Sequence, residues 1–142
     1  MKLLNLQVRL CGGFLPEWKS HDDSGLDLRA SEDIVILAYT TKVVRLGIVT
    51  AFAPMYTGII KDRSGIASKH GVFTHAGVID SSYRGEWGVV MENSSEDPYK
   101  VSRGDRICQV LFLPCFHLQI EEVTELPTSF RDGGGFGSTG LK

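Results

Sequence analysis

The sequence lacks the features that mark membrane, secreted and disulfide-bonded proteins. No run approaches the ~20 apolar residues of a membrane-spanning helix, and residues 1–10 lack the apolar core and cleavage site of a signal peptide. Cys11, Cys108 and Cys115 are an odd number without paired spacing. We therefore expect no disulfide framework and predict a reducing compartment, either the cytoplasm or the interior of a host cell.

The chain also has little excess charge of either sign. The formal net charge is −2 over 142 residues, with 23% charged residues. This balance provides no basic field for nucleic acid or for an anionic membrane, and we expect neither as a partner. An anionic ligand would instead require a few cationic side chains placed around it.

Familiar metal-binding and catalytic motifs are missing. His21, His70, His75 and His117 are scattered, without the spacing of a zinc or iron site. No Gly-x-Ser-x-Gly elbow supports a serine hydrolase. The glycine-rich run at residues 135–140 has no following helix, so it does not match a dinucleotide-binding fingerprint.

The chain is instead rich in short strand-like segments. A chain of 142 residues is sufficient for one domain with a single core. Segments of Val, Ile, Thr and aromatic residues alternate with turns that draw on sixteen glycines. The expected strands are 3–10, 26–30, 34–38, 42–52, 57–61, 72–74, 77–80, 87–93, 99–101, 107–113 and 116–123, with one helical turn at 64–70. This pattern predicts an all-β sandwich, barrel or jelly roll.

The stretch at residues 77–86 is the most distinctive. Val78 and Ile79 end a strand, and a polar reversal follows before the chain runs back from Trp87. This pattern predicts a β-hairpin with a long loop. Asp80 and Tyr83 in that loop suit a small-molecule site, although the stretch taken alone favours the simpler interpretation, in which Asp80 caps its own turn.

Three other stretches carry polar residues in unusual places. Asp27 lies in an apolar strand and needs partners there, so it is either a structural anchor or a support for a site. Arg63 and Ser64 stand at a strand-to-helix transition, which suits phosphate or a simple serine cap beside a surface arginine. Gln109 alternates with apolar neighbours, so it faces either solvent or a ligand.

The C-terminal residues differ from the rest. From residue 127 onward the chain has too little apolar area to order itself. One interpretation is a disordered tail. The other is an arm that orders over a ligand, because Arg131, Ser138, Thr139 and several glycines suit a phosphate clamp. We therefore predict a β-domain at 1–126 and a flexible arm at 127–142.

Taken together and in order, these motifs form a specific pattern. The chain resembles the trimeric dUTP diphosphatase (dUTPase) family in five motifs at 24–30, 63–65, 77–85, 104–109 and 134–140. The resemblance implies a distorted jelly-roll or barrel-like subunit and a homotrimer with sites shared between subunits. It also implies hydrolysis of dUTP to dUMP and pyrophosphate, with Mg²⁺ held mainly by the phosphates. Such an enzyme limits uracil incorporation into DNA and supplies dUMP for thymidylate synthesis.

The resemblance also implies residue roles. Asp80 is the expected general base that activates water for in-line attack on the α-phosphorus. The expected uracil and deoxyribose contacts are Ala76, Gly77, Val78, Ile79, Tyr83 and Phe136, with Tyr83 leaving no room for a 2′-hydroxyl. The expected phosphate contacts are Arg63, Ser64, Gly65, Gln109, Arg131, Gly137, Ser138 and Thr139. Asp27 and Asp105 are expected to support the site without transferring protons.

Two positions depart from the family pattern. Asp62 stands where the family usually has proline, and its carboxylate is expected to pair with Arg63 and weaken that phosphate contact. His75 stands where a small residue is common, beside the expected uracil site. It faces solvent or makes binding sensitive to pH near its titration range.

Two other functions compete with dUTP hydrolysis. The dCTP deaminases share this fold family, but they use a glutamate and lack the aromatic arm, so Asp80 and Phe136 favour the diphosphatase. A nucleotide-gated protein that regulates a partner is a rival of another class. The retention of Asp80 and Tyr83 argues against a role in binding alone.

Overall fold

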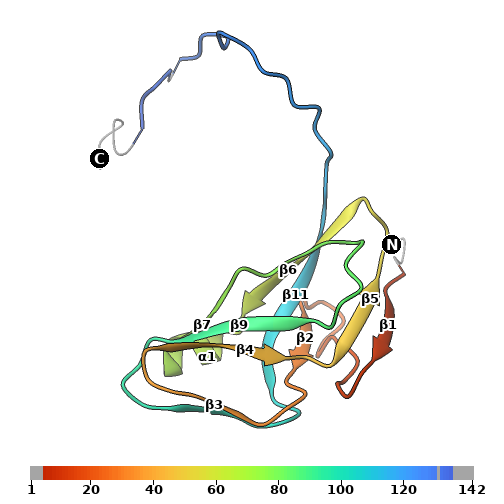
Figure 1. The fold of residues 1–142 in the computed structure, drawn as a ribbon, viewed down its shortest axis with the longest axis vertical. Helices are drawn as coiled ribbons and strands as arrows, with labels where there is room; N and C mark the ends of the chain where they lie inside the picture. Colours follow the sequence, from red (N-terminus) through yellow and green to blue (C-terminus); the bar gives the residue numbers. More distant parts are fainter. Residues whose placement is uncertain (1–4, 131, 136–142) are drawn as a thin grey trace.

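The computed structural model describes residues 5–130 and 132–135. This part of the chain forms short strands and one helix, as Figure 1 shows. The elements are β1 (Gln7–Leu10), β2 (Leu26–Arg29), β3 (Ile34–Ile36), β4 (Thr40–Arg45), β5 (Ile48–Ala51), β6 (Tyr56–Asp62), α1 (Ser64–His70), β7 (Val72–His75), β8 (Val78–Ile79), β9 (Gly88–Asn93), β10 (Tyr99–Val101) and β11 (Arg106–Pro114). Among these residues no helix is long and apolar enough to span a membrane.

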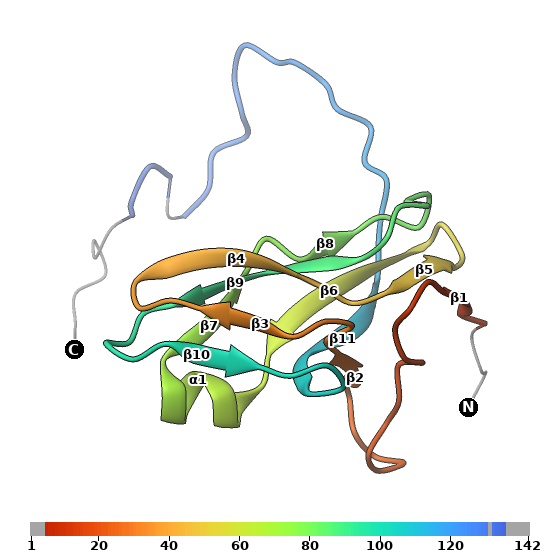
Figure 2. The same ribbon diagram turned by 60° about the horizontal axis from the view of Figure 1, so that its bottom comes forward.

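The strands pair in antiparallel fashion into four small sheets. One has the order β2-β11-β6-β8 and another β4-β9-β7, while β1 pairs with β5 and β3 with β10. Apolar side chains from all four sheets meet in one core, where Trp87 is the largest fully buried residue. Figure 2 shows the strands gathered into one body with α1 at one end. The predicted all-β, jelly-roll-like fold is confirmed, although the sheets stay open rather than closing into a barrel.

One predicted strand is wrong because it is two strands. The segment 42–52 bends at Gly47, which has φ +66°, and the carbonyl of Gly47 accepts hydrogen bonds from Cys11 N (2.8 Å) and Gly13 N (3.0 Å). A Cβ at position 47 would lie 2.3 Å from Gly13 N. The close approach of the loop at residues 11–13 therefore requires glycine and a bend at position 47. Strand propensity, which depends only on neighbouring residues, does not predict this bend.

The predicted hairpin at 77–93 is also wrong. Val78 and Ile79 in β8 pair with Ile59 and Gly58 in β6, whereas β9 pairs with β4 and β7. The loop at 80–87 therefore carries the chain from one sheet to another. The cause is long-range, because Trp87 is buried in the core and its N–H bonds to Ile48 O at 2.8 Å.

The expected strand at 116–123 is absent from the described residues. The chain leaves the sheets after β11, and the blue segment in Figure 1 extends away from them. Phe116, Leu118 and Ile120 alternate as strand residues would, but each is more than 80% exposed. A strand requires a partner, and this segment pairs with none within the described chain. The division at residue 126 remains a prediction.

The three cysteines are free, as expected, but their environments differ. Cys108 is buried in β11, and burial raises the pKa of its thiol, with smaller contributions from the Asp27 and Asp62 carboxylates. We expect iodoacetamide to spare Cys108 in the folded protein and to modify it in denaturant, because the thiolate is the reactive form. Peptide mass spectrometry measures this directly, and rapid modification of folded protein at Cys108 would contradict it.

Candidate active site

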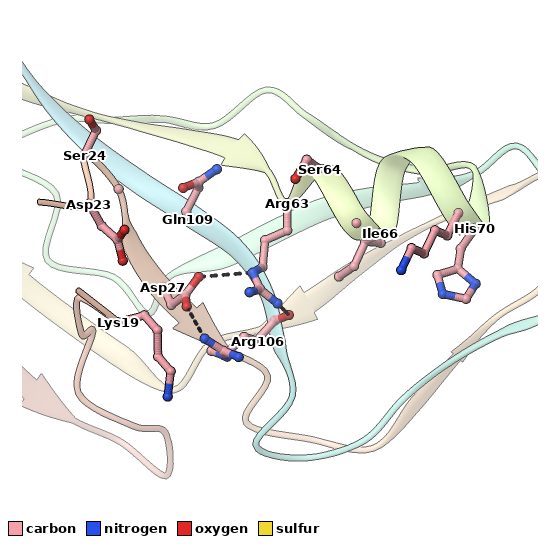
Figure 3. A pocket seen from close by; sticks show the side chains of 13 residues that line it. Lys19, Asp23, Ser24, Asp27, Arg63, Ser64, Ile66, His70, Arg106 and Gln109 are labelled. Atoms are coloured by element: carbon pink, nitrogen blue, oxygen red, sulfur yellow. Dashed lines mark hydrogen bonds and ion pairs between the residues drawn. The ribbon is translucent and has the colours of Figure 1, made fainter.

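A groove with a volume of about 610 Å³ lies where β2, β6 and β11 meet the start of α1 (Figure 3). The residues that line it come from three of the predicted motifs, from the loop before β2 and from the rest of α1. They are Lys19, Asp23, Ser24, Gly25, Asp27, Arg63, Ser64, Gly65, Ile66, Lys69, His70, Arg106 and Gln109. The antiparallel register explains this meeting, because Gln109 pairs with Asp27 on one side and with Lys61 on the other.

Asp27 organises the floor of the groove. It is 8% exposed, and its carboxylate forms ion pairs with Arg63 Nε at 3.1 Å and Arg106 Nη1 at 2.8 Å. The expectation that a buried Asp27 has partners is confirmed. Sequence reasoning missed Arg106 as one of them, because only the register of β11 brings it to β2. One carboxylate thus holds two guanidinium groups in place.

The structure contradicts the expected pairing of Asp62 with Arg63. The Asp62 carboxylate accepts hydrogen bonds from Thr74 N at 2.5 Å and Thr74 Oγ1 at 2.6 Å, which tie the end of β6 to β7. Arg63 instead pairs with Asp27 and donates to Arg106 O at 3.1 Å. The two neighbouring side chains therefore have separate partners.

Ser64 does not cap the helix. The N-cap position is Arg63, without a side-chain capping bond, and α1 begins at Ser64. Ser64 and Gly65 are both exposed and both border the groove. The interpretation of Ser64 as a simple cap is therefore wrong, and its side chain borders the groove instead.

Gln109 faces the groove rather than the core. Its Nε2 donates to Asp62 O at 2.8 Å, while the adjacent Cys108 and Val110 are fully buried. Gly25 makes room for this side chain, because a Cβ there would lie 2.3 Å from Gln109 Oε1.

We expect Gly25→Ala to displace Gln109 and to raise KM for an anionic substrate by about tenfold, with a smaller change in kcat. Steady-state kinetics measures the changes in KM and kcat separately. Gln109→Ala is the matched control: if the alanine acts through Gln109, combining both changes costs no more than either alone. Additive losses would contradict this route.

The charge of the groove favours an anion. Lys19, Lys69, Arg63 and Arg106 face only two carboxylates, Asp23 and Asp27, so the lining carries an excess of two positive charges. No motif spacing marks the two lysines, and sequence reasoning missed both. The arrangement provides the locally placed cations that a nearly neutral chain needs to bind phosphate.

The third motif lies at the opposite end of β6 from the groove. Ile79 pairs with Gly58, so Asp80 sits beside the start of β6, about 20 Å along that strand from Arg63. Asp80 is exposed, and its carboxylate accepts no hydrogen bond from the described residues. The interpretation of its carboxylate as a cap for its own turn is therefore wrong.

The backbone before Asp80 is strained. Ala76 has φ +56° and Gly77 has φ +93°, and Gly77 O accepts Ile60 N at 2.8 Å. A left-handed alanine costs on the order of 1 kcal/mol, and such strain often accompanies a functional site. Val78 is exposed beside this turn, whereas Ile79 is buried.

Three of the remaining predicted residues lie within the described chain, and one of them, Tyr83, is 45% exposed in the loop after β8. Asp105 supports a turn, since its Oδ2 accepts Ser102 N at 2.8 Å. His75 is half-exposed, and its Nε2 lies 2.5 Å from Glu92 Oε2. Arg131, Phe136, Gly137, Ser138 and Thr139 lie outside the described residues.

An open all-β domain with a cationic groove has the character of a protein that binds small anionic ligands. The family model for dUTPase matches residues 13–140, and the chain belongs to the dUTPase family. The deoxyuridine 5′-triphosphate nucleotidohydrolase of Gloeothece citriformis is 42% identical over 89% of each chain. That of Crocosphaera subtropica is 37% identical over 99% of each chain.

Solved structures show the same fold. A point mutant of the Staphylococcus bacteriophage 80alpha dUTPase with dUpNHpp has a TM-score of 0.91, covering 96% of this chain and 99% of its own at 24% identity. A phage phi11 dUTPase, described with a structural Mg(II) ion, has a TM-score of 0.82 at 22% identity and covers 87% of this chain and 99% of its own.

Proposed function

We propose that the protein hydrolyses dUTP to dUMP and pyrophosphate. The observation that carries this proposal is the groove, where three dUTPase motifs meet in a lining with excess positive charge. Arg63, Ser64, Gly65 and Gln109 bind the triphosphate. Asp27 keeps Arg63 and Arg106 in place and takes no part in proton transfer, while Asp105 supports the turn that leads into β11.

Asp80 acts as the general base. Its carboxylate accepts a proton from a water molecule while the water oxygen attacks the α-phosphorus in line with the departing bridging oxygen. The bond between the α-phosphorus and that oxygen breaks, and pyrophosphate leaves. The proton on Asp80 then passes to solvent. An exposed carboxylate without hydrogen-bond partners in the described chain is free for this role.

The base and the sugar bind beside Asp80. Backbone groups of Ala76, Gly77, Val78 and Ile79 hydrogen-bond the uracil edge, where cytosine would leave polar groups unpaired. Tyr83 lies beneath the deoxyribose and excludes a 2′-hydroxyl. The arm at 127–142 closes over the nucleotide, with Phe136 on the base and Arg131, Gly137, Ser138 and Thr139 at the γ-phosphate.

The complete site requires more than one copy of the chain, and we propose a homotrimer. About 20 Å separates Asp80 from Arg63 along β6, too far for both to act at one α-phosphorus. The exposed, alternating Phe116, Leu118 and Ile120 further support assembly, because a neighbouring subunit would cover them. Light scattering should give about three times the chain mass of 15.6 kDa.

Mg²⁺ assists by neutralising phosphate charge. Among the described residues, no three His, Cys, Asp or Glu side chains come together to hold a metal ion. A carboxylate-poor, arginine-rich groove therefore fits a metal that takes its ligands mainly from phosphate oxygens. We propose that the protein acts in the cytoplasm or inside a host cell, without nucleic acid or membrane as a partner.

Product analysis tests the activity. The protein is incubated with Mg²⁺ and dUTP, dCTP, dTTP or UTP, and each product is identified by chromatography. Release of dUMP and pyrophosphate from dUTP alone is expected. Deamination of dCTP would favour the deaminase, and tight dUTP binding without turnover would favour a nucleotide-sensing regulator.

A further inference from the structure

We infer that Glu86 and Arg45 position Tyr83, and that this ion pair sets how strictly the site rejects ribonucleotides. The inference rests on the proposed function, because it concerns the deoxyribose end of the same site. Neither residue lines the phosphate groove, and neither is among the residues expected to contact substrate.

Glu86 fastens the loop at 80–87 to the bend between β4 and β5. Its Oε2 accepts Arg45 Nη2 at 2.7 Å, and Arg45 Nε lies 3.1 and 3.2 Å from the two carboxylate oxygens. Oε1 also accepts the backbone N–H of Gly47 at 3.2 Å. A two-pronged, charge-assisted contact of this kind fixes both distance and orientation.

The Glu86 side of the pair is partly shielded from water, whereas the Arg45 side is exposed. The Glu86 side chain is 28% exposed and that of Arg45 is 59% exposed. The hydrogen bond from Arg45 is the largest cause of the lowered pKa of Glu86, so the carboxylate is charged at neutral pH. This geometry should hold its loop more firmly than a fully exposed ion pair would.

Tyr83 rests directly on the segment that Glu86 fastens. Its hydroxyl donates to Glu86 O at 3.2 Å. A Cβ at Gly85 would lie only 2.3 Å from Tyr83 Oη and 2.4 Å from Cζ, so the ring lies flush against the backbone of residue 85. The position of the ring therefore follows the backbone at residues 85–86, which the Arg45 contact restrains.

A separate contact restrains the Asp80 end of the loop. Arg84 Nη1 donates to Ser81 O at 2.6 Å and to Thr50 O at 3.2 Å in β5, and Tyr83 N bonds to Asp80 O at 3.1 Å. Loss of the Glu86 contact should therefore loosen Tyr83, which lies beneath the deoxyribose. The segment around Asp80 should stay in place, because Arg84 still holds it. Discrimination between sugars should change more than the chemical step.

The experiment compares Glu86→Gln and Arg45→Gln with the unmutated protein. We expect the ratio of kcat/KM for dUTP to that for UTP to fall about fivefold in each variant, through a lower KM for UTP. The kcat for dUTP should change by less than about threefold. Because the two side chains act as one unit, the double variant should lose no more selectivity than either single variant.

Asp33→Asn is the matched control. Asp33 Oδ1 accepts a hydrogen bond from the backbone N–H of Arg103 at 2.7 Å, so its carboxylate restrains a different loop through a backbone contact. Its dUTP/UTP ratio should not change. Circular dichroism and unfolding midpoints verify that the compared variants are folded.

An unchanged ratio in folded Glu86→Gln, or an equal loss with both nucleotides, would overturn the inference and leave the proposed function intact. If the unmutated protein binds nucleotides without turning them over, the affinity ratio of α,β-imido dUTP to α,β-imido UTP replaces kcat/KM and decides in the same way. Absence of both turnover and binding would overturn the proposed function and this inference together.

Discussion

Asp80→Asn should reduce kcat for dUTP by about 10³-fold, because a positioned general base contributes roughly 10² to 10⁴. The asparagine has nearly the same shape but does not accept the proton of the attacking water. Since the Asp80 carboxylate has no hydrogen-bond partner within the described residues, the fold should tolerate the change. Rapid-quench measurement of dUMP formation gives the rate.

Binding separates this role from a contact with substrate. The affinity for α,β-imido dUTP, measured by calorimetry, should stay within about threefold of the unmutated protein. A large loss of affinity with an unchanged rate at saturation would remove Asp80 from the chemistry and make it a binding residue.

Two inactive variants should restore activity when they are mixed. Arg63→Gln removes a proposed phosphate contact from the groove, while Asp27 keeps Arg106 as a partner. Asp80→Asn removes the proposed general base on another part of the chain. If each site combines the groove of one subunit with Asp80 of a neighbour, an equal mixture should regain about a quarter of the unmutated activity.

Mixed trimers form by refolding the two variants together, and each variant refolded alone is the control. Failure to regain activity, with mixed trimers verified by mass spectrometry of differently tagged chains, would show that groove and base act within one chain. The refolded unmutated protein sets the scale for recovery.

The sequence predicts best those features that depend on residues close together in the chain. The helix at 64–70 was predicted at its observed bounds, and most strands were placed to within a few residues. The alternation around Gln109 also indicated a side chain that faces away from the core, and the groove confirms it. These features depend on periodicity and on neighbouring residues.

Features that depend on distant partners were not predictable. The two arginines of Asp27 meet it across strand pairings that no local pattern reveals. The supposed hairpin failed for the same reason, since β8 pairs with β6 and the loop after it crosses to another sheet. Asp62 also has its partner, Thr74, on a neighbouring strand rather than next to it in sequence.

The placement of Asp27 between Arg63 and Arg106 has a consequence for the rates of substrate binding and product release as well as for affinity. The rotamer entropy of each arginine side chain corresponds to a free energy of about 2 kcal/mol. Because Asp27 already holds both arginines, much of that entropy is lost when the protein folds. Under the proposed function, an arriving triphosphate would thus meet guanidinium groups that are ordered beforehand. The Asp27 carboxylate would compete with the phosphates for those groups and weaken the hold on a departing pyrophosphate. We therefore expect a buried residue without a chemical step of its own to favour both rapid capture of the substrate and rapid release of the product.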